Sequence, residues 1–468
     1  MVKLFLPLLL IFSFQNLRAE IKHEVQLLNR CYSQLVNKRI SPDHELVQKI
    51  IKQELSGSEA CSELIGKLSF DQEGMLTPKN DESLEILRTI QKIHDSWFPR
   101  FNFNISTQDF PNTDFYDANE MGYHFTWVLL KNEKVENVLT KKRSFMGLRE
   151  SEKEHRYFID RRIRGHRQLR TEHPVHKWKI GGSEDEKSDE FLGPISFWSP
   201  ELTQFGKLVG LRPYTDSKNR IKKWLGGKKL EEFDTKAPQG GGIIGTSSYL
   251  LLNTEHIDQR NDGGNRLHRR WATSVTSDLL CRNLPILSKK EAEVFVRKKS
   301  KIGFRQKADC MNCHSTIDTM AAVIRNMENY NSGNVDIHYT IRNIYMHQTK
   351  SVHAGELPDS SEYFFETSPE GIFIHKDIFG RRIETKVRSL NELGKALSQT
   401  KDFYYCLSKR YFEFFTGIEV NIEQIDWSKS TDPVVVFLKK SAEELRRTQN
   451  VKKYLSSLFN SPFYKEGK

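Results

Sequence analysis

One five-residue run, Cys310-Met311-Asn312-Cys313-His314, constrains the fold of this chain more than any other feature. Residues three and four positions apart lie on one face of a helix, so a helix here places both thiols and the imidazole on the same side. The C-x-x-C-H spacing is that of covalent haem c attachment, with two thioethers to the haem and the histidine on the iron. We therefore expect one haem c (iron) per chain, bound through Cys310, Cys313 and His314, in a cytochrome-c-like segment.

Two other kinds of site use the same residue types. A redox disulfide between Cys310 and Cys313 is expected to follow a strand in a β-α-β unit, whereas residues 289–309 have the pattern of charged helix and loop. A zinc site needs a fourth ligand, such as His338 or His347. Haem c is the preferred interpretation, because the rest of the chain also indicates export.

The N-terminus has the pattern of a secretory signal peptide. Residues 1–3 are positively charged, residues 4–14 are apolar, and a plausible processing site ends at Ala19. The apolar run is shorter than the ~20 residues that a membrane-spanning helix needs. We expect residues 1–19 to be removed and the mature chain to be periplasmic with no transmembrane span.

The mature chain is expected to be basic. Its formal charge falls from +11 to +9 when the signal peptide removes Lys3 and Arg18. Residues 155–179 hold eight of the arginines and lysines, and this cluster is either a docking face for an acidic redox partner or a solvated surface. Export argues against a nucleic-acid partner, and the sequence leaves the oligomeric state open.

Four further cysteines lie outside the motif. In an oxidising compartment an even number suggests two disulfides, for which we favour Cys31 with Cys61 and Cys281 with Cys406. The alternative is four buried thiols, because cysteine packs well as a small apolar residue.

Apolar periodicity predicts a mainly α, multidomain fold in which helical domains flank the haem segment. Residues 20–100 form a helical domain, with helices expected at 24–36, 43–55, 58–68 and 83–94. An irregular segment with some helix follows at 101–238, and the haem c domain covers 239–350. Residues 351–388 contain a small β-hairpin with Phe379-Gly380 near its tip, and residues 389–468 form a second helical domain with helices at 390–415 and 432–459.

A longer series of short elements surrounds the motif. In chain order it comprises Gly240-Gly241-Gly242-Ile243-Ile244-Gly245, Tyr249-Leu250, Arg269-Arg270-Trp271, Leu279-Leu280-Cys281 with Pro285, the haem motif, Ile317-Asp318 and Glu328-Asn329-Tyr330. This order resembles the planctomycete-type cytochrome-c-associated domains of unknown function, which combine a single haem domain with a C-terminal helical domain. The family usually has Asp-Pro-Leu-Gly after the haem histidine, where this chain has Asp318-Thr319-Met320-Ala321. The resemblance implies haem binding and an architecture, and no particular reaction.

The role of the haem depends on the ligand at the sixth position of the iron. Candidates are Met327, Met346, His338 and His347, whereas Met320 is too close to His314 along the helix to reach the opposite side of the ring. A closed site indicates electron transfer within an envelope assembly, and an open one a peroxidase or oxidase type of enzyme. A third hypothesis is a structural envelope protein that the haem stabilises. No acid-base pair for catalysis is evident.

Overall fold

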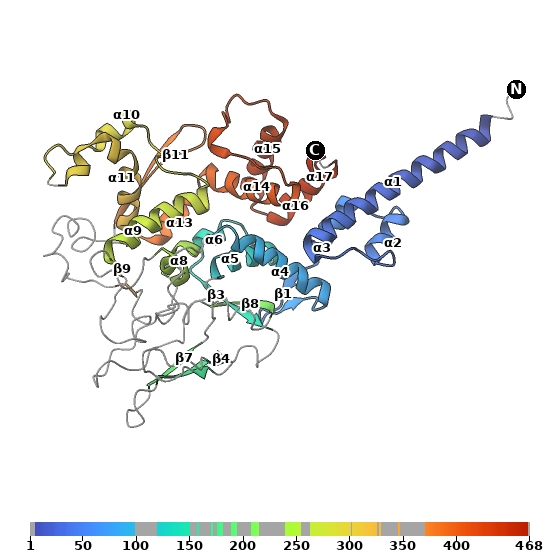
Figure 1. Ribbon diagram of the computed structural model, residues 1–468, viewed down its shortest axis with the longest axis horizontal. Helices are drawn as coiled ribbons and strands as arrows, with labels where there is room; N and C mark the ends of the chain where they lie inside the picture. The colour runs from blue at the N-terminus through green and yellow to red at the C-terminus, as the bar shows by residue number, and fades with distance from the viewer. Residues whose placement is uncertain are drawn as a thin grey trace.

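The computed structural model describes residues 5–98, 119–149, 207–214, 239–253, 263–300, 302–324 and 370–466, together with short strands at 157–158, 170–171, 176–180, 189–193, 327–328 and 345–346. Within these residues the protein is mainly α-helical (Figure 1). The strands pair into two-stranded antiparallel sheets. The predicted fold class, mainly α with a small β-hairpin, is confirmed.

The N-terminal elements are α1 (Phe5–Val36), α2 (Glu45–Ile51), α3 (Gly57–Gly66), β1 (Ser69–Phe70), β2 (Leu76–Thr77) and α4 (Asp81–Asp95). All four predicted helices are present, and side-chain caps mark where α2, α3 and α4 begin. At α3, the Ser56 hydroxyl accepts a hydrogen bond from the Glu59 amide and the Glu59 carboxylate accepts one from the Ser56 amide. The Asn80 side chain caps α4 in a similar way, accepting from the Ser83 amide.

Helix α1 begins well away from the rest of the molecule and packs against it only further along (Figure 1). The Glu24 carboxylate accepts a hydrogen bond from the Gly57 amide. Arg30 donates to the Tyr464 carbonyl at 2.9 Å, and Gln34 donates to the Phe415 carbonyl at 3.0 Å. Residues from 24 onward therefore hold α1 against both α3 and the C-terminal helices.

The middle segment contributes a buried helix that the sequence did not locate. Every residue of α5 (Glu120–Leu130) is buried, as expected for a helix that is apolar on all sides. Strands β3 (Ser144–Arg149) and β8 (Leu208–Tyr214) pair antiparallel, and β3 lies against α5. The other described elements here are α6 (Asn137–Thr140), β4 (Tyr157–Phe158), β5 (Arg170–Thr171), β6 (His176–Ile180) and β7 (Asp189–Gly193). Residues 120–149 are therefore more regular than the sequence analysis expected, because they form α5, α6 and β3.

Short helices dominate the segment around the C-x-x-C-H motif. They are η3 (Gly242–Gly245), α8 (Ser247–Leu252), α9 (Gly263–Ser274), the π-helical η4 (Val275–Leu279), α10 (Lys289–Ala292), η5 (Glu293–Phe295), η6 (Gly303–Gln306), α11 (Ala308–Ala321) and η7 (Ala322–Ile324). Two short strands follow, β9 (Met327–Glu328) and β10 (Tyr345–Met346). Helix α11 carries the whole motif.

The predicted hairpin is formed by β11 (Gly371–Lys376) and β12 (Arg382–Val387). The strands pair from Gly371 opposite Val387 to Lys376 opposite Arg382. Gly380 lies in the connecting turn with φ +81°, a conformation that favours glycine. The strands and the tip are as expected, and the first part of the predicted 351–388 region, up to residue 369, lies outside the described residues.

The C-terminal elements are α13 (Leu390–Ser398), α14 (Lys401–Thr416), η9 (Ile422–Gln424), α15 (Pro433–Thr448), α16 (Val451–Phe459) and α17 (Pro462–Lys465). The sequence predicted two long helices here, and each is divided. Thr400 begins a new helix by accepting a hydrogen bond from the Phe403 amide. Gln449 ends α15 with a left-handed φ of +57°, and Asn450 caps α16.

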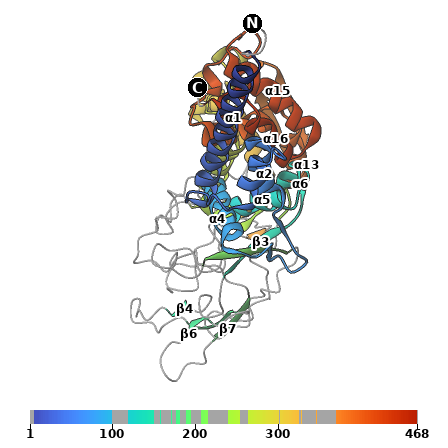
Figure 2. The same ribbon diagram turned by 90° about the vertical axis from the view of Figure 1, so that its right-hand side faces the viewer.

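The N-terminal and C-terminal helices share one hydrophobic core. Buried side chains from Leu27 to Tyr464 belong to a single packed cluster. At its centre the His94 ring on α4 contacts the Thr126 hydroxyl of α5 and the Tyr411 hydroxyl of α14, each at 2.8 Å. Helix α16 packs against α3 and α5, and Figure 2 shows α1, α2 and α16 gathered on one side of the molecule.

Candidate haem attachment site

Helix α11 brings together the three residues that the motif singles out. Cys310, Cys313 and His314 are all partly exposed. Met311 and Met320 on the same helix are buried, so α11 has a packed side and an accessible one. The accessible side carries both thiols and the imidazole, as the spacing predicted.

The imidazole of His314 is held in a defined orientation. Its ring stacks on Phe304 of η6, with the ring centroids 4.2 Å apart and the planes 29° from parallel. Its Nδ1 lies 3.3 Å from each carboxylate oxygen of Asp318, one helical turn further along α11. In the described part of the chain Nε2 makes no hydrogen bond. A histidine anchored through Nδ1 has Nε2 left to bind a metal.

Asp318 is in turn held by an arginine from α9. Arg269 Nε lies 2.7 Å from one carboxylate oxygen and Nη2 lies 3.2 Å from the other, in a two-point contact. Burial raises the pKa of Asp318, but the hydrogen bonds from His314 and Arg269 outweigh it, so the pKa is lowered overall. The carboxylate is therefore ionised at neutral pH, with both of its oxygens close to Nδ1 of His314.

The two thiols of the motif are separate in the structure. Cys310 and Cys313 are free, and burial, followed by the proximity of Cys310, raises the pKa of Cys313. Redox-active C-x-x-C motifs lower the pKa of a thiol to make it a better nucleophile, so the direction here is the opposite one. The direction at Cys313 therefore does not indicate a thiol activated for disulfide exchange.

Neighbouring elements fix the position of α11. Lys289 on α10 pairs with Asp309 at 2.8 Å, close to the start of the helix. Strand β11 approaches its other end so closely that a Cβ on Gly371 would lie 2.6 Å from the Thr319 carbonyl oxygen. The His268 ring on α9 contacts the Ile324 carbonyl just beyond the helix at 3.0 Å. The helix that carries the motif is therefore held by contacts from α9, α10 and β11.

Several segments that carry the family resemblance meet in space. The indole nitrogen of Trp271, which is fully buried, donates to the Ile244 carbonyl in the glycine-led segment at 2.9 Å. Gly242 there has a φ of +58°, and a Cβ would collide with the Val138 carbonyl oxygen.

The sequence singled out Arg269 and Asp318 as parts of a pattern, but it did not pair them. Phe304 was missed, because nothing in its local sequence indicates that it packs on His314.

The distal candidates are only partly described. Met327 on β9 and Met346 on β10 are cross-strand partners in the sheet register, so the backbone brings these two candidates together. His338 and His347 lie outside the described residues. Met320 is fully buried in the core.

The remaining cysteines behave differently from one another. Cys281 and Cys406 form a disulfide with an S–S distance of 2.02 Å, as predicted. The expected Cys31–Cys61 bond is not formed, and the alternative of buried free thiols applies to this pair. Burial and the neighbouring Cys31 raise the pKa of Cys61 well above its usual value, which disfavours the thiolate that disulfide formation requires.

The side chains of the basic cluster at residues 155–179 lie outside the described residues, so the docking face remains a prediction.

Among the described residues, no group of three or more His, Cys, Asp or Glu side chains is gathered closely enough to hold a metal ion alone. Haem c attachment does not need such a group, because only the imidazole binds the iron and the thiols bond to the edge of the ring. The arrangement of Cys310, Cys313 and His314 fits this donor set.

Comparison of the chain with protein-family models, curated proteins and solved structures gives no match. In the part of the chain that the structure describes, no helix combines the length and apolarity needed to cross a membrane.

Proposed function

We propose that this protein is an exported c-type cytochrome that carries one haem through Cys310, Cys313 and His314 and transfers electrons within an envelope assembly. The observation that carries the proposal is the accessible side of α11, where two thiols lie beside an imidazole anchored through Nδ1 to Asp318. When bound, a haem supplies one-electron chemistry at its iron. The proposal includes removal of residues 1–19 and a periplasmic location.

The residues around His314 have separable tasks in this proposal. Asp318 would accept a hydrogen bond from Nδ1, which would fix the tautomer and leave Nε2 to bind the iron. Arg269 holds the carboxylate and keeps it ionised. Phe304 covers one face of the imidazole and limits its rotation. Thioether bonds from Cys310 and Cys313 would hold the ring against the helix.

The cleavage site is compatible with the way α1 is anchored. In the part of α1 whose side chains are described, the hydrogen bonds to the body include those of Glu24, Leu27, Arg30 and Gln34, all beyond Ala19. Loss of residues 1–19 leaves these contacts in place. Mass spectrometry of the N-terminus of the secreted protein tests this step, and a mature chain that keeps residue 1 would contradict it.

Covalent haem attachment is tested by producing the full chain in a periplasm with haem-c maturation factors. The wild-type protein should retain haem after acid-acetone extraction, whereas the Cys310→Ser/Cys313→Ser variant should not. The matched control is Cys31→Ser/Cys61→Ser, which removes the other close pair of free thiols and should leave the haem in place. A wild-type protein without covalent haem refutes the proposal, and bound zinc in its place would support the zinc alternative.

The role of the haem is tested by adding carbon monoxide to the reduced protein. An unchanged spectrum indicates a closed iron with two protein ligands, as electron transfer requires. A shifted spectrum indicates an open position and would replace electron transfer by ligand binding or peroxide chemistry. A haem-free variant with normal stability would argue against a purely structural haem.

A further inference from the structure

A second site lies away from α11, in a cavity of about 1150 Å³. Its walls come from the end of α4, from η4 and the residues that follow it, from α14, and from the loop leading to η9. The Cys281–Cys406 disulfide joins two of these walls, because Cys281 follows η4 and Cys406 lies one turn before Arg410 on α14. The cavity is thus built between covalently connected elements.

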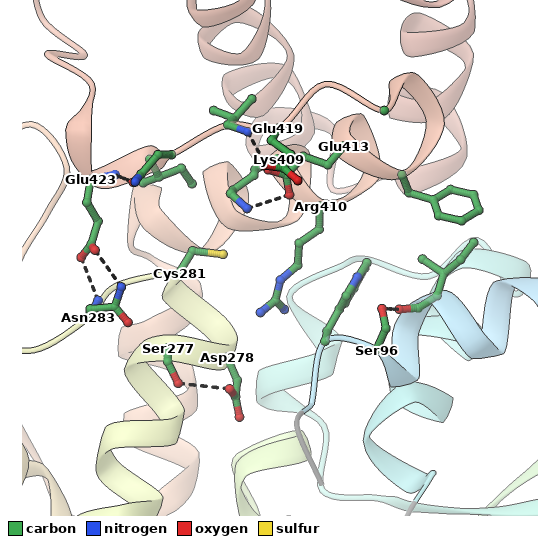
Figure 3. Close-up of a pocket in the computed structure, with 17 residues that line it drawn as sticks. Ser96, Ser277, Asp278, Cys281, Asn283, Lys409, Arg410, Glu413, Glu419 and Glu423 are labelled. Carbon is green, nitrogen blue, oxygen red and sulfur yellow. Dashed lines mark hydrogen bonds and ion pairs between the residues drawn. The ribbon is translucent and has the colours of Figure 1, made fainter. Parts of the chain in front are cut away.

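Arg410 extends from α14 into this cavity and carries no dashed contact in Figure 3. In the described part of the chain its guanidinium makes no hydrogen bond and no ion pair, and its Nη1 is fully buried. The Trp97 ring lies against it, with its centroid 5.2 Å from Cζ. Burial lowers the pKa of Arg410 to about 10, so it remains a cation at neutral pH. Arg410 as a whole is partly exposed, but its buried Nη1 has no hydrogen-bond partner among the described residues, and buried donors left without a partner are costly.

Three other charged residues that line the cavity, Lys409, Glu413 and Glu423, are already engaged. Lys409 pairs with Glu413 at 2.6 Å, and Glu413 also accepts a hydrogen bond from the Val420 amide at 2.7 Å. Glu423 accepts two hydrogen bonds from Asn283, one from its amide and one from its side chain, each at 2.8 Å. These contacts leave Arg410 as the lining cation with unused donors among the described residues.

Asp278 on η4 is the carboxylate that faces Arg410, and the two charges attract each other. It forms no ion pair with Arg410 in the described structure and accepts hydrogen bonds from Tyr249 and Ser277, each at 3.1 Å. Burial raises the pKa of Asp278 to about 6, so the group loses its negative charge in mildly acidic solution. Asp278 is engaged by Tyr249 and Ser277, and both Asp278 and Arg410 line the cavity.

We infer that this cavity binds a small molecule through an oxyanion group, a carboxylate, phosphate or sulfate, that Arg410 receives with two parallel hydrogen bonds. The planar guanidinium fits such groups in a two-point geometry, and Trp97 limits the orientation of the fork. The hydroxyl of Ser96 and the Asp278 side chain line the same cavity and supply polar groups for the rest of the ligand. The inference is independent of the haem.

The test is a thermal-shift and calorimetric titration of the full protein with succinate, phosphate and sulfate at constant ionic strength, with chloride as the reference. At least one oxyanion should raise the unfolding midpoint in a saturable way, and Arg410→Gln should weaken its affinity at least about tenfold. The matched control Arg446→Gln, which removes an exposed arginine from α15, should bind as the wild type does. Equal shifts with chloride, or equal affinity in Arg410→Gln, would overturn the inference.

Two further measurements cover other outcomes. If Arg410→Gln does not fold, wild-type crystals soaked in selenate should show an anomalous peak beside Arg410, and a saturated crystal without such a peak overturns the inference. The titration is also run on the haem-free Cys310→Ser/Cys313→Ser variant. Binding to that variant alone would assign the guanidinium to a haem propionate and would exclude a diffusible ligand. Binding to both forms supports the inference.

Discussion

The buried histidine at the centre of the core makes protein stability depend on pH in a way that can be calculated. His94 is fully buried between Thr126 and Tyr411, and burial lowers its pKa to about 3, from an ordinary value of 6.5. Below pH 6.5, His94 is protonated in the unfolded chain but stays neutral in the folded protein until the pH approaches 3. The free energy of unfolding is therefore unaffected above pH 7 and falls as the pH is lowered from 6.5 towards 3.

The size of this loss follows from the two pKa values. Between pH 7.5 and pH 5.0, proton uptake by the unfolded His94 should lower the free energy of unfolding by about 2 kcal/mol. His94→Gln keeps hydrogen-bonding groups at this position but cannot titrate. The variant should be less stable at pH 7.5, because the ring contacts with Trp97 and Tyr411 are lost, and it should lose about 2 kcal/mol less than the wild type on acidification.

The assay is urea denaturation at both pH values, followed by far-ultraviolet circular dichroism. The exposed His23 on α1 provides the control, and His23→Gln should keep the full pH dependence of the wild type. His124, whose pKa burial and Arg143 lower, accounts for part of the dependence that remains. The same loss of stability in the wild type and in His94→Gln would refute the reasoning, since it would show that His94 can be protonated in the folded state.

Three further predictions concern the disulfide, the glycine-led segment and the candidate haem site. Replacing Cys281 and Cys406 by serine should cost about 5 kcal/mol in urea denaturation, because the bond closes a loop with a sequence separation of 125 residues. Gly242→Ala should destabilise the protein by several kcal/mol more than Gly417→Ala in the same assay, since both have positive φ but only Gly242 faces a backbone oxygen. Asp318→Asn should raise the reduction potential of the haem in redox titration, because it removes the negative charge that His314 contacts.

Each of these has an outcome that would contradict it. A loss below 1 kcal/mol would show that the disulfide constrains little, and equal effects of the two alanine variants would show that the backbone near Gly242 can move. For the haem, Asp309→Asn is the matched control, because this exposed carboxylate lies on the same helix and pairs with Lys289. Equal potentials in Asp318→Asn and Asp309→Asn would exclude a specific effect through His314.

The sequence alone was sufficient where local chemistry decides the outcome. Helix periodicity located α1, α3 and α4, and alternation with a glycine turn located the β11–β12 hairpin. The spacing of Cys310, Cys313 and His314 predicted one shared helical face. These features depend on residues within a few positions of one another, so the local sequence pattern is enough to predict them.

Local patterns did not predict where a long apolar-periodic stretch is broken into two helices. The breaks at Thr400 and Gln449 depend on one capping hydrogen bond and one left-handed residue, which periodicity does not record. Helix α5 was missed because it is apolar on all sides and so lacks the amphipathic pattern that marks a surface helix.

Only the tertiary structure decided which distant residues meet. Asp318 pairs with Arg269, which is 49 residues away in the sequence, and His94 contacts Tyr411, which is 317 residues away. The cavity at Arg410 exists because α4, η4 and α14 pack around it, and no short stretch of sequence marks a guanidinium that lacks a partner. The physical reason is that burial and pairing depend on the packing of whole elements, whereas a motif records only the spacing along one of them.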